Sequence, residues 1–410
     1  MLDLAAICIV VTAVLAYVNQ RFVRLPLSIG VMVLALSLSL AIVLLSSLGF
    51  PALRKHEEAF LQSINFSDVL LQGMLSFLLF AGALHVNLDA LKRYRWQVAS
   101  LAVVGTILST LVIGAALRVA LPWLGLELPW LHCLLFGALI SPTDPVAVLG
   151  ILKSMNAPKP LEVVIAGESL FNDGVGVVMF SLLLGIAASG SSPSAVSAGL
   201  MLLQEAGGGV AFGLLLGFLA VGMLKSIDQY HVEVLITLAV VVGGYALASR
   251  LHISGPLAMV VAGLMVGNRG RSHAMSDRTR QYMDMFWDLL DEILNAVLFV
   301  LLGLEVLMVE FSTALVLAGA LAIVIALGAR LLTVGVPVSL FRKTFDLPKG
   351  SPSVLVWGGL RGGISVALAL WVPAGRERLI ILAMTYCVVV FSIFAQGLTV
   401  PALVRRATRK

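Results

Sequence analysis

Long apolar runs, each close to 20 residues and separated by short polar stretches, recur along almost the whole chain. A run of that length crosses the hydrocarbon core of a bilayer as one α-helix. Thirteen such spans are predicted, near residues 4–19, 26–48, 68–86, 98–121, 130–151, 161–188, 204–224, 232–249, 254–268, 284–306, 311–339, 351–374 and 379–403. The sequence therefore predicts an all-α polytopic membrane protein, with residues 1–410 forming a single integral membrane domain and no soluble regulatory domain.

Composition agrees with this class and excludes others. The chain is 60% hydrophobic and 12% charged, whereas soluble domains contain about 25% charged residues. Its formal charge of +5 is spread over short loops and not gathered on one face, so no nucleic-acid partner is predicted. Membrane lipid is the expected environment. The three cysteines lie in apolar segments at unrelated spacings, which indicates neither a disulfide framework nor a metal site.

The distribution of Lys and Arg predicts the orientation of the spans. Of the 27 basic residues, three (Arg118, Arg330 and Arg361) lie within spans, five lie in loops on one side, and the remaining 19 lie on the other. Cytoplasmic loops of membrane proteins carry the excess of positive charge. The N-terminus is therefore predicted to lie outside and the C-terminus in the cytoplasm.

Two of the spans contain residues that interrupt a helix. The fifth carries SPTDP, in which Pro142 and Pro145 bracket Thr143 and Asp144, and the twelfth carries WGGLRGG around Arg361. Each proline removes a helical hydrogen bond, and non-helical backbone at this depth is tolerated only when it is buried in protein or lines a cavity. Paired interruptions in the two halves of a chain point to a transporter site built on inverted repeats.

The sixth span carries several polar residues within AGESLFNDGVGVV, residues 166–178. In a helix, Ser169 and Asp173 share one face, and Glu168 and Asn172 share another about 100° away. Oxygen atoms from Asp173, Ser169 and Thr143, with Asp144 beside them, suit a small hard cation.

A second role is expected for the other face of the same helix. Glu168 and Arg361 would each be costly alone in the membrane, so we expect them to form a buried structural ion pair. Asn172 cannot titrate. One exchangeable carboxylate, Asp173, is therefore predicted at the site.

These motifs resemble a known family. SPTDPVAV, then GESLFNDGVGVV and finally GGLRGGIS are similar to the NhaP-type sodium/proton antiporters, the bacterial branch that also includes the animal sodium/hydrogen exchangers. The resemblance covers essentially all the membrane chain. It implies a homodimer of 13-helix protomers in the bacterial inner (plasma) membrane, with two broken helices crossing in a transport subdomain, which we place near residues 68–188 and 284–374, and the other spans in a dimerisation subdomain.

The resemblance also implies roles for individual residues. Asp173 would bind the cation and exchange the proton, with Asn172, Ser169, Thr143 and Asp144 around it. Sodium would be held at Asp173, Ser169 and Thr143, with lithium as a second substrate and no cofactor. Asn172 stands where electrogenic relatives have a second Asp, which implies electroneutral one-for-one exchange.

One departure from the family and one further acidic stretch complete the expectations. The third span reads LLFAGALHVNL, with Ala81 where many prokaryotic members have an acidic residue; His85 lies one turn further on. In the tenth span, Asp288, Asp291 and Glu292 form an acidic stripe that could funnel cations from the cytoplasm.

Several alternatives remain open at this stage. No HExxH, GxSxG or kinase motif appears, so an enzyme is not predicted. A potassium/proton antiporter on the same scaffold is the alternative substrate assignment, because ligand types alone do not set cavity size. A passive channel or an ion-sensing receptor is a further alternative, although a pore would normally show symmetric rings of carbonyls or charges.

Overall fold

The computed structural model describes residues 2–47, 74–155, 157–189, 195–305, 312–342 and 344–408. In these residues the chain is helical, with short π- or 3₁₀-helical turns labelled η, and the only β pairing is one isolated bridge. The elements are α1 (Leu2–Val18), η1 (Asn19–Val23), α2 (Leu27–Ser47), α5 (Leu75–Leu84), α6 (Leu88–Arg93), α7 (Arg95–Ala99), η3 (Ser100–Gly105), α8 (Thr106–Ala120), η4 (Leu121–Leu124), α9 (Trp130–Ile140), α10 (Val146–Ser154), α11 (Lys159–Ser189), α12 (Ala195–Lys225), α13 (Tyr230–Arg250), α14 (Gly255–Met265), η5 (Val266–Gly270), α15 (Arg271–His273), α16 (Asp277–Glu305), α17 (Thr313–Arg330), η7 (Leu331–Gly335), α18 (Val336–Leu340), α19 (Ser351–Trp357), α20 (Gly363–Trp371), α21 (Arg376–Phe391), η8 (Ser392–Gly397) and α22 (Leu398–Thr408).

The all-helical class predicted from the apolar runs is confirmed. Each of the thirteen predicted spans has a helical counterpart, although the third is described only from residue 74. Seven helical stretches in the described residues are long and apolar enough to cross a membrane by length and composition, and three apolar helices are shorter. The count of thirteen stays a prediction.

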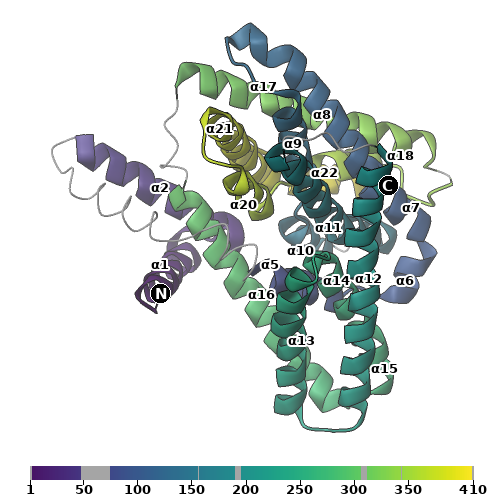
Figure 1. Ribbon diagram of the computed structural model, residues 1–410. Helices are drawn as coiled ribbons and strands as arrows, with labels where there is room; N and C mark the ends of the chain where they lie inside the picture. Colours follow the sequence, from purple (N-terminus) through teal and green to yellow (C-terminus); the bar gives the residue numbers. More distant parts are fainter. Residues whose placement is uncertain are drawn as a thin grey trace.

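By their most extensive contacts, the described helices, labelled in Figure 1, fall into two groups. We call residues 88–189 and 313–408 the crossing group, because α8 with α9, α11 with α9, and α17 with α21 make its most extensive contacts. The flanking group is residues 2–47, 74–84 and 195–305, in which α12 and α5 pack on α14, and α2 packs on α16.

The transport subdomain predicted near residues 68–188 and 284–374 stays a prediction. It includes the spans of α5 and α16, which have their most extensive contacts with α14 and α2. Both helices also contact the crossing group, α5 on α11 and α16 on α20.

Each half of the crossing group contains one helix broken in the middle. The first break is residues 141–145, between α9 and α10, and the second is residues 358–362, between α19 and α20. The two extended segments meet in an antiparallel bridge between Asp144 and Leu360. The paired breaks predicted from proline and glycine are therefore confirmed, and they cross.

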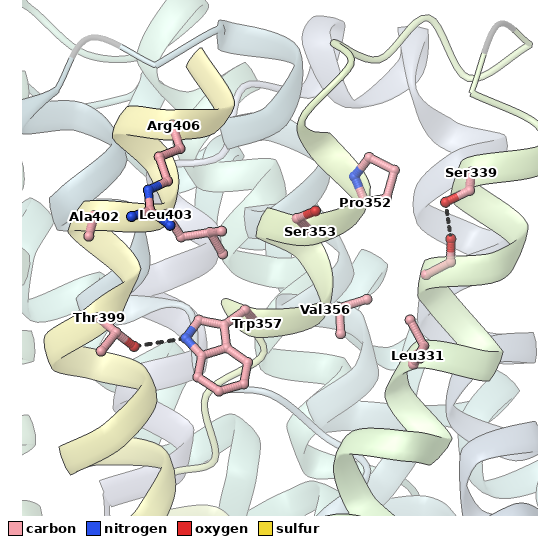
Figure 2. A pocket seen from close by; sticks show the side chains of 11 residues that line it. Leu331, Ser339, Pro352, Ser353, Val356, Trp357, Thr399, Ala402, Leu403 and Arg406 are labelled. Carbon is pink, nitrogen blue, oxygen red and sulfur yellow. Dashed lines mark hydrogen bonds between the residues drawn. The ribbon is translucent and has the colours of Figure 1, made fainter. Parts of the chain in front are cut away.

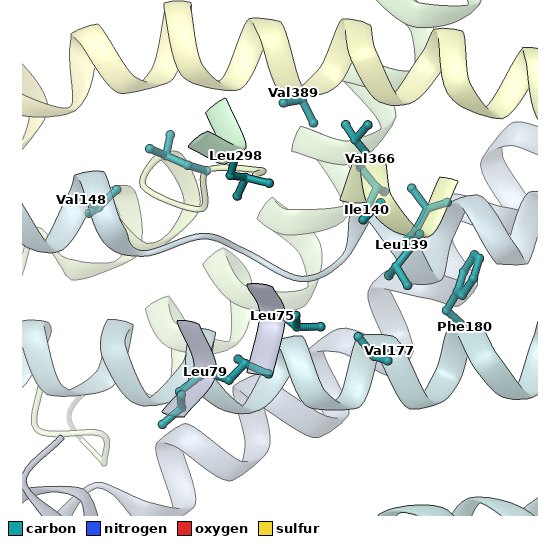
Figure 3. Packing of buried hydrophobic residues seen from close by; sticks show 14 of the residues in the cluster. Leu75, Leu79, Leu139, Ile140, Val148, Val177, Phe180, Leu298, Val366 and Val389 are labelled. Carbon is teal, nitrogen blue, oxygen red and sulfur yellow. The ribbon is translucent and has the colours of Figure 1, made fainter. Parts of the chain in front are cut away.

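Apolar side chains from both halves enclose this crossing. Ile140 and Val148 flank the first break, and Val366 follows the second; all three are fully buried. Figure 3 shows them with Val389 of α21 and Leu298 of α16, in the same buried cluster. Burial among packed side chains is what allows non-helical backbone at this depth.

Candidate ion-binding site

Helix α11 holds the first break in place through two side chains on adjacent faces. The Asn172 amide donates to Thr143 Oγ1 over 3.0 Å, and its oxygen accepts from the Thr143 backbone N–H over 3.3 Å. The Ser169 hydroxyl donates to the Thr143 carbonyl. Three polar groups of Thr143 thus have partners on α11, and all three residues are buried. Asn172 therefore holds the first break against α11 through two hydrogen bonds to Thr143.

The second break supplies the backbone that crosses Asp144. The Asp144 N–H donates to the Leu360 carbonyl over 2.8 Å. Two residues on, Gly362 lies so close that a Cβ added to it would be 2.5 Å from Asp144 Oδ2 and 3.0 Å from Asp144 Cβ. A glycine is required at 362 because any larger side chain would push the two broken segments apart.

Arg361 does not form the ion pair predicted with Glu168. Its guanidinium Nη1 donates to the carbonyl of Pro142 over 2.7 Å and also to that of Ser141, while its backbone N–H donates to Ser392 Oγ over 2.8 Å. In an intact helix, the Ser141 carbonyl would accept from residue 145, which is a proline without an N–H. Arg361 replaces that missing donor and places positive charge just beyond the C-terminal end of α9.

The partner of Glu168 is Arg330. Arg330 Nη2 lies 3.1 Å from Glu168 Oε2, and Nη1 donates to Oε1, so the pair is bidentate. Arg330 Nε and Nη2 also donate to the Leu355 carbonyl over 3.3 and 3.2 Å, near the end of α19. The prediction of a Glu168–Arg361 pair was wrong because the cost of burying Glu168 is offset by Arg330, the other buried arginine of this region.

Asp173 lines a cavity of about 430 Å³ that reaches the protein surface. Thr143 and Asp144 line the same cavity at its inner end, where Asp173 is 7% exposed. Within the part of the chain that the structure describes, the Asp173 carboxylate takes part in no hydrogen bond or ion pair. The carboxylates of Asp173 and Asp144 and the side chain of Thr143 thus belong to residues that line one water-accessible space.

Acidic residues of α16 line the cavity toward its mouth. Asp291 and Asp288 lie along the wall, and the Asp288 side chain is 65% exposed. His85 Nε2 lies 2.9 Å from Asp288 Oδ1 at this outer end. Glu292, the third member of the predicted funnel, is exposed and does not line the cavity, because it points to another face of α16.

The structure places the five predicted site residues together, since Asn172 and Ser169 bind Thr143, and Asp173 and Asp144 share its cavity. Ala81 is buried outside the lining, whereas His85 is part of it.

Four residues of the site were missed or given no role in it: Arg330, Ser392, Asn295 and Ser365. A buried arginine inside a span was the one available signal for Arg330.

Comparisons with known proteins give the family. The model of the sodium/hydrogen exchanger, transmembrane family matches residues 9–406. The chain is 53% identical to the Na⁺/H⁺ antiporter NhaP of Pseudomonas aeruginosa, covering 99% of this chain and 97% of that protein. It is 34% identical to the Na⁺/H⁺ antiporter NhaH of Halobacillus dabanensis, covering 87% of each.

A solved structure shows the same fold. The sodium proton antiporter MjNhaP1 of Methanocaldococcus jannaschii superposes with a TM-score of 0.76 at 20% identity, covering 99% of this chain and 98% of that one. With its motifs, its fold and its relatives in agreement, the chain belongs to the sodium/hydrogen exchanger family, and it is a membrane transporter, not an enzyme.

Proposed function

We propose that this protein is a secondary antiporter that exchanges Na⁺, and also Li⁺, for H⁺ at Asp173. The observation that carries the proposal is the position of Asp173, which lines the inner end of an acidic cavity beside the oxygens of a broken helix. The names of the relatives support the choice of sodium and protons. A small monovalent cation would be held by Asp173 with Thr143 and Ser169.

Exchange follows from competition for one carboxylate. A cation and a proton cannot both neutralise Asp173 at once, so loading one requires release of the other. The transport subdomain, near residues 68–188 and 284–374, then carries the loaded site between the two membrane faces, while the other spans form the contacts of a homodimer. The cavity would open to the cytoplasm, because it ends beside the loops richest in Lys and Arg. This topology leaves the N-terminus outside.

The first test replaces the carboxylate. In proteoliposomes with an imposed proton gradient, Na⁺, Li⁺ and K⁺ are added in turn and proton movement is followed with a pH-sensitive dye. Asp173→Asn should abolish the response to every cation, because an amide cannot gain or lose the proton. Asp89→Asn is the matched control, since the Asp89 side chain is 91% exposed and pairs with Lys92 on the surface.

Each outcome of this assay is informative. Cation-driven proton movement that persists in Asp173→Asn contradicts the assignment of Asp173. A wild-type response to K⁺ alone would instead support the potassium/proton alternative. Acid inhibition that saturating Na⁺ fails to relieve would contradict competition at one carboxylate.

The second test concerns charge. Asn172 stays neutral in its bonds to Thr143, and Glu168 stays paired with Arg330, so the moving site would carry the same charge with Na⁺ or with H⁺ bound. One cation exchanged for one proton moves no net charge. The rate should therefore not change with an imposed membrane potential, although each uncompensated charge would feel about 2.3 kcal/mol per 100 mV. A sustained transport current would contradict electroneutral exchange and implicate Asp144, the other carboxylate at the crossing.

A further inference from the structure

A second cavity, of about 660 Å³, lies on the crossing group away from Asp173. Its walls are η7 and α18 on one side, α19 on another and α22 on the third. Figure 2 shows Arg406, Ser353 and Ser339 toward one end of the cavity and Trp357, Val356 and Leu331 toward the other. The cavity is thus polar at one end and apolar along its length.

The polar end is basic. Arg406, in the last turn of α22, lines it, and Arg342 and Lys349 lie in the segment that joins α18 to α19. In the described residues none of these three forms an ion pair, and the one Asp of that segment, Asp346, pairs with Arg93 over 3.2 Å. The mouth of the cavity therefore attracts an anion.

The dimensions correspond to one leaflet of the membrane. Thr399 and Arg406 are seven residues apart on α22, which is about 10 Å along the helix axis. Half of the hydrocarbon core is about 15 Å. A charged end at the membrane surface and an apolar channel of this depth match the headgroup and the upper acyl chain of a phospholipid.

We propose that this cavity binds an anionic glycerophospholipid, with its phosphate at Arg406 and an acyl chain against Trp357. Basic pockets between membrane helices are known to bind anionic headgroups. The charge at the mouth selects an anionic lipid over a zwitterionic one. The apolar wall excludes a free phosphate as the complete ligand.

The lipid would lie against the residue that precedes the second break. Trp357 Nε1 donates to Thr399 Oγ1 over 2.8 Å, and the Trp357 carbonyl accepts from Gln396 over 2.9 Å. Gly358 follows at once and opens the segment that crosses Asp144. A bound acyl chain thus holds α19 and α22 together beside the ion site. This consequence rests on the proposed function, whereas lipid binding itself does not.

The binding test uses native mass spectrometry on protein released from phosphatidylcholine nanodiscs that contain phosphatidylglycerol. Arg406→Gln should lower the retained phosphatidylglycerol about fivefold, because the basic residue at the phosphate is lost. Arg405→Gln is the matched control, because Arg405 is a neighbouring exposed arginine that does not line the cavity. It should retain lipid as the wild type does.

A second pair of variants tests the channel. Ala402→Phe places a ring in the cavity, whereas Leu398→Phe enlarges a side chain on the same helix that is 47% exposed and outside the lining. Only Ala402→Phe should displace lipid.

The arginine variants have two outcomes that contradict the proposal. Equal loss of phosphatidylglycerol from Arg406→Gln and Arg405→Gln would show general attraction of lipid to a basic surface. No loss of phosphatidylglycerol from either variant would show that no site exists.

The same spectra distinguish another occupant. A change in the number of protomers with Ala402→Phe, at unchanged lipid retention, would show that another protein chain covers the groove and would overturn the proposal. Binding is read without transport, so inactive protein still tests it. In active protein, exchange by the wild type should respond to phosphatidylglycerol, and exchange by Arg406→Gln should not.

Discussion

The ion pair between Glu168 and Arg330 offers the sharpest test of the packing. Its side chains are 2% and 8% exposed, and both guanidinium nitrogens that face Glu168 bind a carboxylate oxygen. Arg330→Met keeps an unbranched apolar stem of similar length but removes the charge. Glu168 is then left in a buried space without its partner.

The expected loss is large. Breaking a buried pair by removing one partner costs about 3 to 5 kcal/mol, because the remaining charge is uncompensated. Arg330 also donates to the Leu355 carbonyl, which would lose its donor and add about 1 kcal/mol. Glu168→Met should lower the free energy of unfolding by about 3 to 5 kcal/mol, without the loss at the Leu355 carbonyl. The double variant should recover most of the loss, since neither charge remains.

The assay is a double-mutant cycle on the free energy of unfolding, measured in mixed micelles with increasing sodium dodecyl sulfate. A parallel cycle pairs Glu168→Met with Arg361→Met, because Arg361 is the equally buried arginine that binds backbone carbonyls instead. The coupling energy should be large for Arg330 and small for Arg361. Additive losses in the Arg330 cycle, or stronger coupling to Arg361, would refute the pairing.

Two further predictions concern the crossing and the cavity. Gly362→Ala should abolish exchange and lower the yield of folded protein, because its Cβ would meet the Asp144 side chain, whereas Gly185→Ala in α11 meets nothing within 4 Å and should behave as wild type in the same flux assay. Asp288→Asn should raise the KM for Na⁺ at low ionic strength and lose this effect at high salt, because it works by attracting cations to the mouth. Glu292→Gln, outside the lining, should leave the KM unchanged at both salt concentrations, and an equal change in both variants would contradict a funnel along Asp288.

The helices and the helix breaks could be predicted because local sequence patterns specify them. Runs of apolar residues specify membrane helices, and Pro142, Pro145 and the glycines around Arg361 specify two breaks, because each acts on its own stretch of backbone. The spacing of Ser169, Asn172 and Asp173 also placed them correctly on α11, next to the first break.

Contacts between side chains that are far apart in the sequence could not be predicted from local patterns. Glu168 and Arg330 are 162 residues apart, and nothing local distinguishes Arg330 from Arg361 as the partner. The choice depends on which carbonyls the breaks leave free, and this follows only from the three-dimensional crossing. The main neighbours of α5 and α16, which are α14 and α2, could not be predicted for the same reason, because an apolar helix does not specify which neighbour it packs against.

The distance along the chain between these partners also sets a delay during synthesis. Glu168 lies 162 residues before Arg330, and the Ser141 carbonyl lies 220 residues before Arg361. At 5 to 20 residues per second, the ribosome needs roughly 8 to 32 s to reach Arg330 after Glu168 is made. Throughout that time the first half of the nascent transporter contains the Glu168 carboxylate without its arginine and the Ser141 carbonyl without its hydrogen-bond donor. The packing of the first half around these groups is completed only when the second half arrives.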